Sequence, residues 1–202
     1  MNAAEMERTL QGISEMLAVI YPREEQWRVT EMTLMGPAMV QDIETLSRAC
    51  PFPLPPSYVQ FLTLHNGCLN FWPKHALMGT VGEPREIVLG GIEDARTYMD
   101  ERIMQLYGEL NRDRVAEYEV PTRNMERLYL PNHTVFAANR RGDFLMFNEE
   151  QKTVAGEYEV VEYSYDASVD ARHRDFPCFL LAIAQTLNER IKMKGYQSAG
   201  PI

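Results

Sequence analysis

The chain has 202 residues, of which 29 are acidic and 20 basic, giving a formal net charge of -9. This length can bury one sizeable core, and contents of 45% hydrophobic and 24% charged residues are ordinary for a globular protein. No apolar run approaches the roughly 20 residues that a membrane span needs, and the acidic balance disfavours nucleic acid and anionic membranes while favouring basic partners. Solubility alone would also explain the acidity, so charge by itself does not identify a partner.

The N-terminus indicates the compartment, and the cysteines exclude two kinds of site. Glu5 and Glu7 stand where a secretory signal would carry positive charge, so we predict a cytoplasmic protein. Cys50, Cys68 and Cys178 are odd in number and far apart, which fits neither a disulfide framework nor a zinc site. We expect them to be small core side chains.

A helix is predicted at the N-terminus. Asn2 can cap it while Glu5 reaches back in a capping-box arrangement, and Pro22 ends it. The inward stripe of this helix repeats at spacings of four and three, and consists of Met6, Leu10, Ile13, Leu17 and Ile20.

A weakly extended segment and a second helix follow. The extended segment is Trp27–Met35, and the helix is Met39–Ala49. We expect residues 1–37 to form a helical extension packed on a domain of residues 38–202, within a single globular unit. The inner face of the second helix is predicted to carry Met39, Ile43 and Leu46.

The run Leu54–Gly67 contains both a start and a stop signal for a short helix. Pro55 and Pro56 mark its beginning, because proline is tolerated in a helix only in the first turn. Asn66 and Gly67 accept the left-handed conformation that closes helices. The buried stripe between these signals consists of Tyr58, Phe61 and Leu62.

The middle of the chain is predicted to contain two strands and a helix. Cys68–Trp72 alternates like a strand, and Gly79–Pro84 is predicted to be a loop. Ile87–Leu89 is predicted as a short strand that stops at the two glycines after it. A helix is expected from Ile92 to about Leu110.

The second half is predicted to be mainly strands, closed by a helix. Thr134–Ala138 and Asp143–Phe147 make a hairpin, and Val154–Tyr165 is strand-like. Phe176–Met193 is a helix terminated at Gly195. Helices at both ends with strands between them predict the α+β class.

Three segments together resemble the SUKH superfamily, which contains bacterial toxin-immunity proteins and relatives of a fungal cell-wall-synthesis regulator. Leu54–Gly67 is similar to the family's pattern of Leu-Pro, Tyr, Phe-Leu and Asn-Gly, and Val135–Phe147 resembles its hairpin with Gly-Asp before an aromatic-containing strand. Phe176–Leu181 is similar to its closing helix. The matching motif residues are Leu54, Pro55, Tyr58, Phe61, Leu62, Asn66, Gly67, Gly142 and Asp143.

The resemblance implies a domain over roughly residues 38–192, with a mostly antiparallel central sheet packed by N-terminal, central and C-terminal helices. It also implies action through protein binding. Helix packing and turn geometry are sufficient to explain the motif residues, so we interpret them as determinants of the fold rather than contacts.

The histidines give no catalytic pattern. His65, His75, His133 and His173 lack the sequence setting of a nucleophile elbow and the spacing of a helical zinc pair. His65, in the last turn of the central helix, is expected to cap that helix. Without a metal, nucleotide or nucleophile signature, we predict a non-enzymatic protein with no cofactor and no metal.

Acidic residues of the second half are the predicted contacts with a protein partner. Strand alternation places Glu157 and Glu159 on one face and Glu162 on the other. A glycosidase-type carboxylate pair is the catalytic alternative, and solvated or partner-facing charge explains these acids better. The candidate contacts are Asp143, Glu157, Glu159, Glu162, Asp166 and Asp170.

Two hypotheses about function remain open. By resemblance, the first is an immunity protein that neutralises a toxin by occlusion, its partner being a basic domain such as a nuclease. The alternative is an intracellular regulatory or scaffolding module of the cell-wall-regulator type. An enzyme of unrecognised type is a third, weaker hypothesis, and the sequence gives no oligomeric state.

Overall fold

The computed structural model describes residues 1–24, 31–108, 110–111, 132–139, 142–163 and 171–196. Within these residues, seven strands form one sheet in chain order, and every neighbouring pair is antiparallel. The predicted α+β class with an antiparallel sheet is confirmed. The elements are α1 (Ala3–Ile20), the 3-10 turn η1 (Tyr21–Arg23), β1 (Thr33–Leu34), α2 (Val40–Ala49), α3 (Pro56–Leu64), β2 (Cys68–Phe71), β3 (His75–Leu77), α4 (Glu83–Tyr107), β4 (His133–Ala138), β5 (Phe144–Lys152), β6 (Tyr158–Tyr163), β7 (Ala171–His173) and α5 (Phe176–Lys194).

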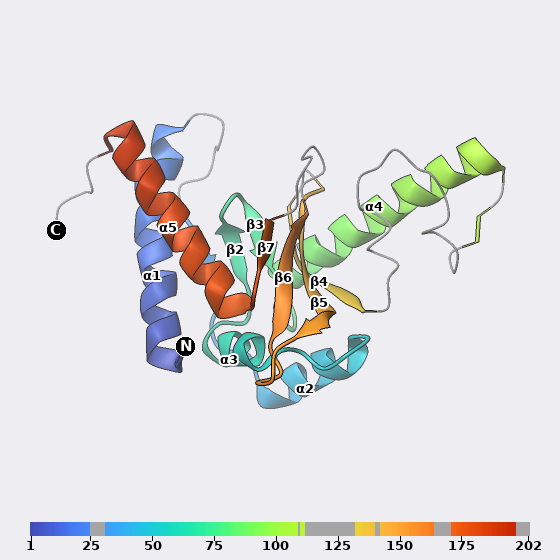
Figure 1. The fold of residues 1–202 in the computed structure, drawn as a ribbon, viewed down its shortest axis with the longest axis horizontal. Helices are drawn as coiled ribbons and strands as arrows, with labels where there is room; N and C mark the ends of the chain where they lie inside the picture. The colour runs from blue at the N-terminus through green and yellow to red at the C-terminus, as the bar shows by residue number, and fades with distance from the viewer. Residues whose placement is uncertain (25–30, 109, 112–131, 140–141, 164–170, 197–202) are drawn as a thin grey trace.

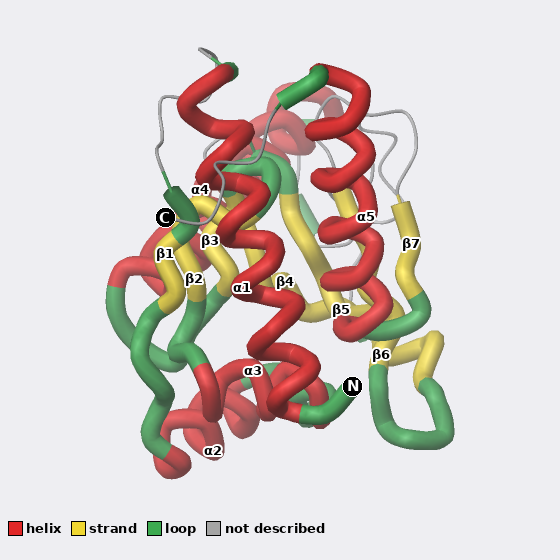
Figure 2. Tube along the Cα trace, turned by 90° about the vertical axis from the view of Figure 1, so that its left-hand side faces the viewer, coloured by secondary structure: helices red, strands yellow, loops and turns green. Residues whose placement is uncertain are grey.

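The helices lie on both faces and at one end of the sheet. α1 and α5 lie side by side over one face, with α5 against β6 and β7 (Figure 2). α4 packs on β3 and β4 from the opposite face and extends beyond the sheet (Figure 1). α2 and α3 cover one end of the sheet (Figure 1). The fold is therefore three-layered, with the core on both sides of the sheet.

The N-terminal helix forms as its sequence predicts. Asn2 Oδ1 accepts from the Glu5 N–H at 3.0 Å, and the Asn2 N–H donates to Glu5 Oε2 at 2.8 Å, which completes the capping box. All five residues of the predicted stripe are fully buried, and α1 packs on α5 and α3. The division of the chain at residue 37 stays a prediction.

α3 begins where its prolines indicate. Pro55 is the N-cap and Pro56 the first helical residue. The Tyr58 ring lies 5.1 to 5.3 Å from the rings of Phe136, Phe147 and Phe176, with edge-to-face geometry. Its hydroxyl donates to the Met78 carbonyl at 2.7 Å. Tyr58 therefore joins α3, the sheet and α5, as expected of a residue that determines the fold.

Asn66 and Gly67 do something other than close α3. The helix already ends at Leu64, and the next residue is extended, with φ of -142°. Asn66 Oδ1 accepts from the N–H and hydroxyl of Thr80 at 2.6 and 3.0 Å. Gly67 has φ of +91°, and a Cβ there would lie 2.8 Å from the Leu77 carbonyl oxygen. The pair packs the end of α3 against the loop that precedes α4.

The predicted strand Ile87–Leu89 is wrong, because α4 runs continuously through both following glycines. A Cβ on Gly90 would meet no atom within 4 Å, whereas a Cβ on Gly91 would lie 3.2 Å from the Cβ of Ala138 on β4. The missing side chain of Gly91 thus lets α4 approach the sheet closely, and this packing outweighs the low helix propensity of glycine.

Three smaller predictions differ at element boundaries. Met39 is the N-cap of α2 and is 66% exposed, although it was placed on the inner face. Only Thr33–Leu34 forms a strand among the described part of Trp27–Met35, and residues 27–30 lie outside the described residues. β6 starts at Tyr158 rather than Val154, since residues 153–157 form a turn.

The predicted hairpin and C-terminal helix are confirmed, whereas the helix expected from Ile92 begins earlier, at Glu83 inside the predicted Gly79–Pro84 loop. β4 and β5 pair as the expected hairpin, with Thr134 opposite Phe147. α5 begins after Asp175, which accepts from the Cys178 N–H at 2.8 Å, and ends at the left-handed Gly195. Cys68 is buried, Cys50 and Cys178 are half-buried, and all are free thiols.

Candidate interaction site

Asp143 belongs to the turn of the β4–β5 hairpin. Its Oδ2 accepts from Asn139 Nδ2 at 2.8 Å, and its N–H donates to Asn139 Oδ1 at 3.2 Å. Gly142 supplies the positive φ of +83° that the turn needs. Gly142 and Asp143 therefore stabilise the turn of the hairpin, which agrees with the interpretation of this motif as a determinant of the fold.

Glu157 lies in the β5–β6 turn and binds the first turn of α3. Its two carboxylate oxygens accept from the N–H of Ser57 at 2.9 Å and from the Ser57 hydroxyl at 2.6 Å. A carboxylate there is favoured by the unpaired N–H groups of the helix N-terminus. Because Glu157 precedes β6, the prediction that it shares a strand face with Glu159 is wrong.

Glu159 and Glu162 lie on β6 and, three residues apart, face opposite sides of the sheet. Glu159 Oε2 accepts from Asn148 Nδ2 and from Arg172, each at 2.9 Å. Glu162 Oε1 lies 2.6 Å from His173 Nε2. Each carboxylate thus joins β6 to a neighbouring strand.

The four predicted acids that the structure describes do not form one cluster. Asp143 lies near the end of β6 that carries Tyr163, since its neighbour Phe144 pairs with Tyr163, whereas Glu157 lies at the opposite end. Asp166 and Asp170 lie outside the described residues. The four described carboxylates are all bonded within the chain, so whether they contact a partner stays a prediction.

His75, which the sequence analysis considered only as a possible catalytic base, is buried in the structure. It is 3% exposed on β3, and burial lowers the pKa of its imidazole. The Trp72 carbonyl, 3.3 Å from Nδ1, and the carboxylates of Asp143 and Glu162 offset this lowering of the pKa only in part.

Among the described residues, no group of three or more His, Cys, Asp or Glu is arranged to hold a metal ion.

His65 connects three segments rather than capping its helix through the ring. It is the C-cap residue of α3, in agreement with its predicted place. However, Nδ1 lies 3.1 Å from the Met35 carbonyl oxygen, and Nε2 lies 2.8 Å from Glu7 Oε2 on α1. The predicted contact with the helix carbonyls is therefore replaced by contacts with the N-terminal residues.

A group of acids on α4 was missed by the sequence analysis. Five exposed carboxylates on this helix make no hydrogen bond or ion pair within the described structure. Their helical spacing was hidden because part of α4 was predicted to be a strand and a loop. These acids are Glu83, Glu86, Glu93, Asp94 and Glu101.

The groove between the first turns of α1 and α5 has a different character. It has a volume of about 500 Å³ and is lined by two arginines, Arg8 and Arg174, one acid, Glu5, and apolar side chains such as Leu181. With two arginines against one glutamate, the lining has an excess of positive charge, which does not suit a basic partner. Within the described residues, α4 is therefore the better match to that expectation.

Comparisons with known proteins place the chain in a family. Among the described helices, none has the length and apolar character that crossing a bilayer requires. Comparison with curated proteins finds no match. The SMI1 / KNR4 family (SUKH-1) matches residues 37–191, a span that includes α3, the β4–β5 hairpin and most of α5. Since the match covers more than half of the chain and the observed α+β fold agrees with it, the chain belongs to the SMI1 / KNR4 family (SUKH-1).

Proposed function

We propose that this chain is a non-enzymatic, cytoplasmic immunity protein that neutralises a toxin by binding it directly. The observation that carries the proposal is the family match over residues 37–191. Family membership supports a role as an immunity protein or a regulator, and protein–protein interaction in general. The toxin partner, the compartment and the lack of catalysis are the further steps that we propose.

The charge of the chain supports a basic partner. A net charge of -9 speeds encounter with a positively charged surface and disfavours acidic competitors. A nuclease domain, which must itself attract nucleic acid, has the complementary charge. Binding by an acidic protein would occlude such a surface without any chemical step.

The acids predicted from the sequence remain proposed contacts, although those in the described residues lie at separate places around β6. Glu162 is the more accessible of the two on β6, with 31% of its side chain exposed, against 16% for Glu159. On binding a partner, Glu159 would have to keep or exchange its contact with Arg172, and Glu162 its contact with His173. Because both are already bonded within the chain, we propose them as secondary contacts with the partner.

The experiment is co-expression with the product of the neighbouring gene. The toxin domain encoded there is produced with and without this chain, and growth and co-purification are measured. We expect the chain to restore growth and to co-purify with the toxin domain at about equimolar ratio. Failure to bind or to protect would contradict the immunity role.

A regulatory or scaffolding module of the cell-wall-regulator type is the second candidate. The same family match supports it, since the family includes both kinds of role. The gene neighbourhood separates the two, because an immunity protein is encoded next to its toxin. A partner that is a host enzyme or scaffold, with no toxin gene nearby, would favour the regulatory role.

A further inference from the structure

α4 turns one long face away from the sheet. Val88, Ala95, Met99 and Ile103 are buried, and α4 packs on β3 and β4. The 3.6-residue period then places the opposite side of the helix outward. We call this outward side the α4 face and define it by Glu83, Glu86, Leu89, Glu93, Asp94, Glu101 and Met104.

The charges of the α4 face are of one sign and unpaired within the described structure. Its five carboxylates are exposed and make no ion pair or hydrogen bond there. The helical period places Arg85, Arg96 and Arg102 to the sides of this face, and Arg85 donates to the Thr80 carbonyl. Like charges spaced along one side of a helix repel each other and lower its stability. A basic partner would relieve this repulsion.

Apolar side chains lie among these acids. Leu89 is 46% exposed and Met104 is 48% exposed, which is unusual for large apolar residues on a helix that also packs on a sheet. Together with the acids they span about 30 Å of helix, comparable to the width of a standard protein interface. Apolar contacts surrounded by charged groups are the usual composition of such an interface.

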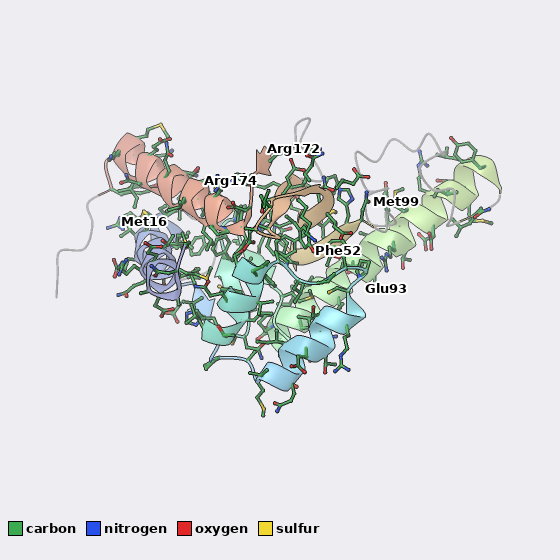
Figure 3. The ribbon with its side chains drawn as sticks, turned by 60° about the horizontal axis from the view of Figure 1, so that its bottom comes forward. Met16, Phe52, Glu93, Met99, Arg172 and Arg174 are labelled. Carbon is green, nitrogen blue, oxygen red and sulfur yellow. The ribbon has the colours of Figure 1, made fainter. Side chains whose placement is uncertain are left out.

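The acids on β6 and the groove between α1 and α5 suit a basic partner less well than the α4 face. Glu159 on β6 is already bonded to Arg172, and the α1–α5 groove is lined by two arginines and only one acid, Glu5. Glu93 and Arg172 lie well apart (Figure 3), so the α4 face is a separate surface from the acids on β6.

We propose that the α4 face is the docking surface for a basic protein domain. This inference rests on the proposed function and names the surface that performs it. The carboxylates would steer the partner and pair with its Lys and Arg side chains. Leu89 and Met104 would supply the apolar contact that slows dissociation.

The test compares two double variants of the full chain, Glu93→Lys/Glu101→Lys and Glu15→Lys/Glu189→Lys. Both pairs are exposed, and both variants change the net charge by the same amount, but Glu15 and Glu189 lie on α1 and α5 at the other face of the sheet. The probe is an inactive form of the toxin domain encoded beside this chain, titrated at low and physiological salt. Circular dichroism checks that the variants fold.

We expect the α4 variant to bind at least about tenfold more weakly and to lose most of its salt dependence, with the control changed by less than about threefold. A third variant, Leu89→Ser, leaves the charge unchanged and is expected to dissociate faster. Equal weakening by both double variants, or normal binding by the α4 variant, would overturn the surface assignment while leaving the immunity role intact. A wild-type chain that does not bind the probe would overturn both.

Discussion

Gly90 and Gly91 are neighbours on α4 that should respond in opposite directions to the same substitution. Alanine at Gly90 adds a Cβ that meets no atom within 4 Å. It gains helix propensity and reduces the freedom of the unfolded chain, which together stabilise by about 0.5–1 kcal/mol. Alanine at Gly91 has the same gain, but its Cβ lies 3.2 Å from the Ala138 Cβ and 3.7 Å from the Phe144 ring.

Neither neighbour of Gly91 can yield easily. Ala138 and Phe144 are fully buried on the paired strands β4 and β5, so α4 must move away from the sheet. Overpacking of this kind costs about 1–3 kcal/mol, which exceeds the propensity gain. We expect Gly91→Ala to lower the free energy of unfolding and Gly90→Ala to raise it, measured by urea denaturation. Equal stabilisation by both would refute the close approach of α4.

Three further predictions concern buried or half-buried charges. Glu157→Ala removes the two hydrogen bonds from Ser57 on α3 and should lower the free energy of unfolding by about 1–3 kcal/mol, measured by urea denaturation. A loss below about 0.5 kcal/mol would show that these bonds do not stabilise the contact between the β5–β6 turn and α3. Arg190→Ala removes the two bonds of 2.8 and 2.6 Å that Arg190 donates to the 8% exposed Glu24 carboxylate, which keeps a 3.4 Å bond from the Tyr196 hydroxyl. This variant should lower the free energy of unfolding by about 2–4 kcal/mol, whereas Lys192→Ala should lower it by less than about 0.5 kcal/mol. The pKa of His75 is lower in the folded than in the unfolded chain, so unfolding takes up a proton and stability falls as pH drops below about 6.5. His75→Gln should flatten this fall between about pH 7.5 and 5.5, and an unchanged slope would count against a buried neutral imidazole.

Elements with local signals at their ends were predictable from the sequence. The capping box at Asn2 and the prolines before α3 depend only on neighbouring residues, so the sequence contains all that fixes them. The β4–β5 hairpin is similar, because its turn residues pair with each other. The resemblance of Leu54–Gly67, Val135–Phe147 and Phe176–Leu181 to one family indicated the fold and the family.

Elements fixed by distant contacts were not predictable in the same way. The two glycines of α4 indicate a break locally, and only the approach to Ala138 explains a helix that continues through them. Likewise, alternation could place Glu159 and Glu162 on opposite faces, but it could not show that Arg172 and His173 bind them. The acids of the α4 face became visible only once the helix was known to begin at Glu83.

A stoichiometric inhibition measurement tests whether this chain neutralises a toxin by binding it, as we propose. Purified chain is added in increasing amounts to the active toxin domain encoded beside it, and the residual toxin activity is recorded. We expect toxin activity to fall to background at about one chain per toxin domain, and inhibition to weaken at high salt. Undiminished activity at roughly tenfold excess of a folded chain would contradict the proposal.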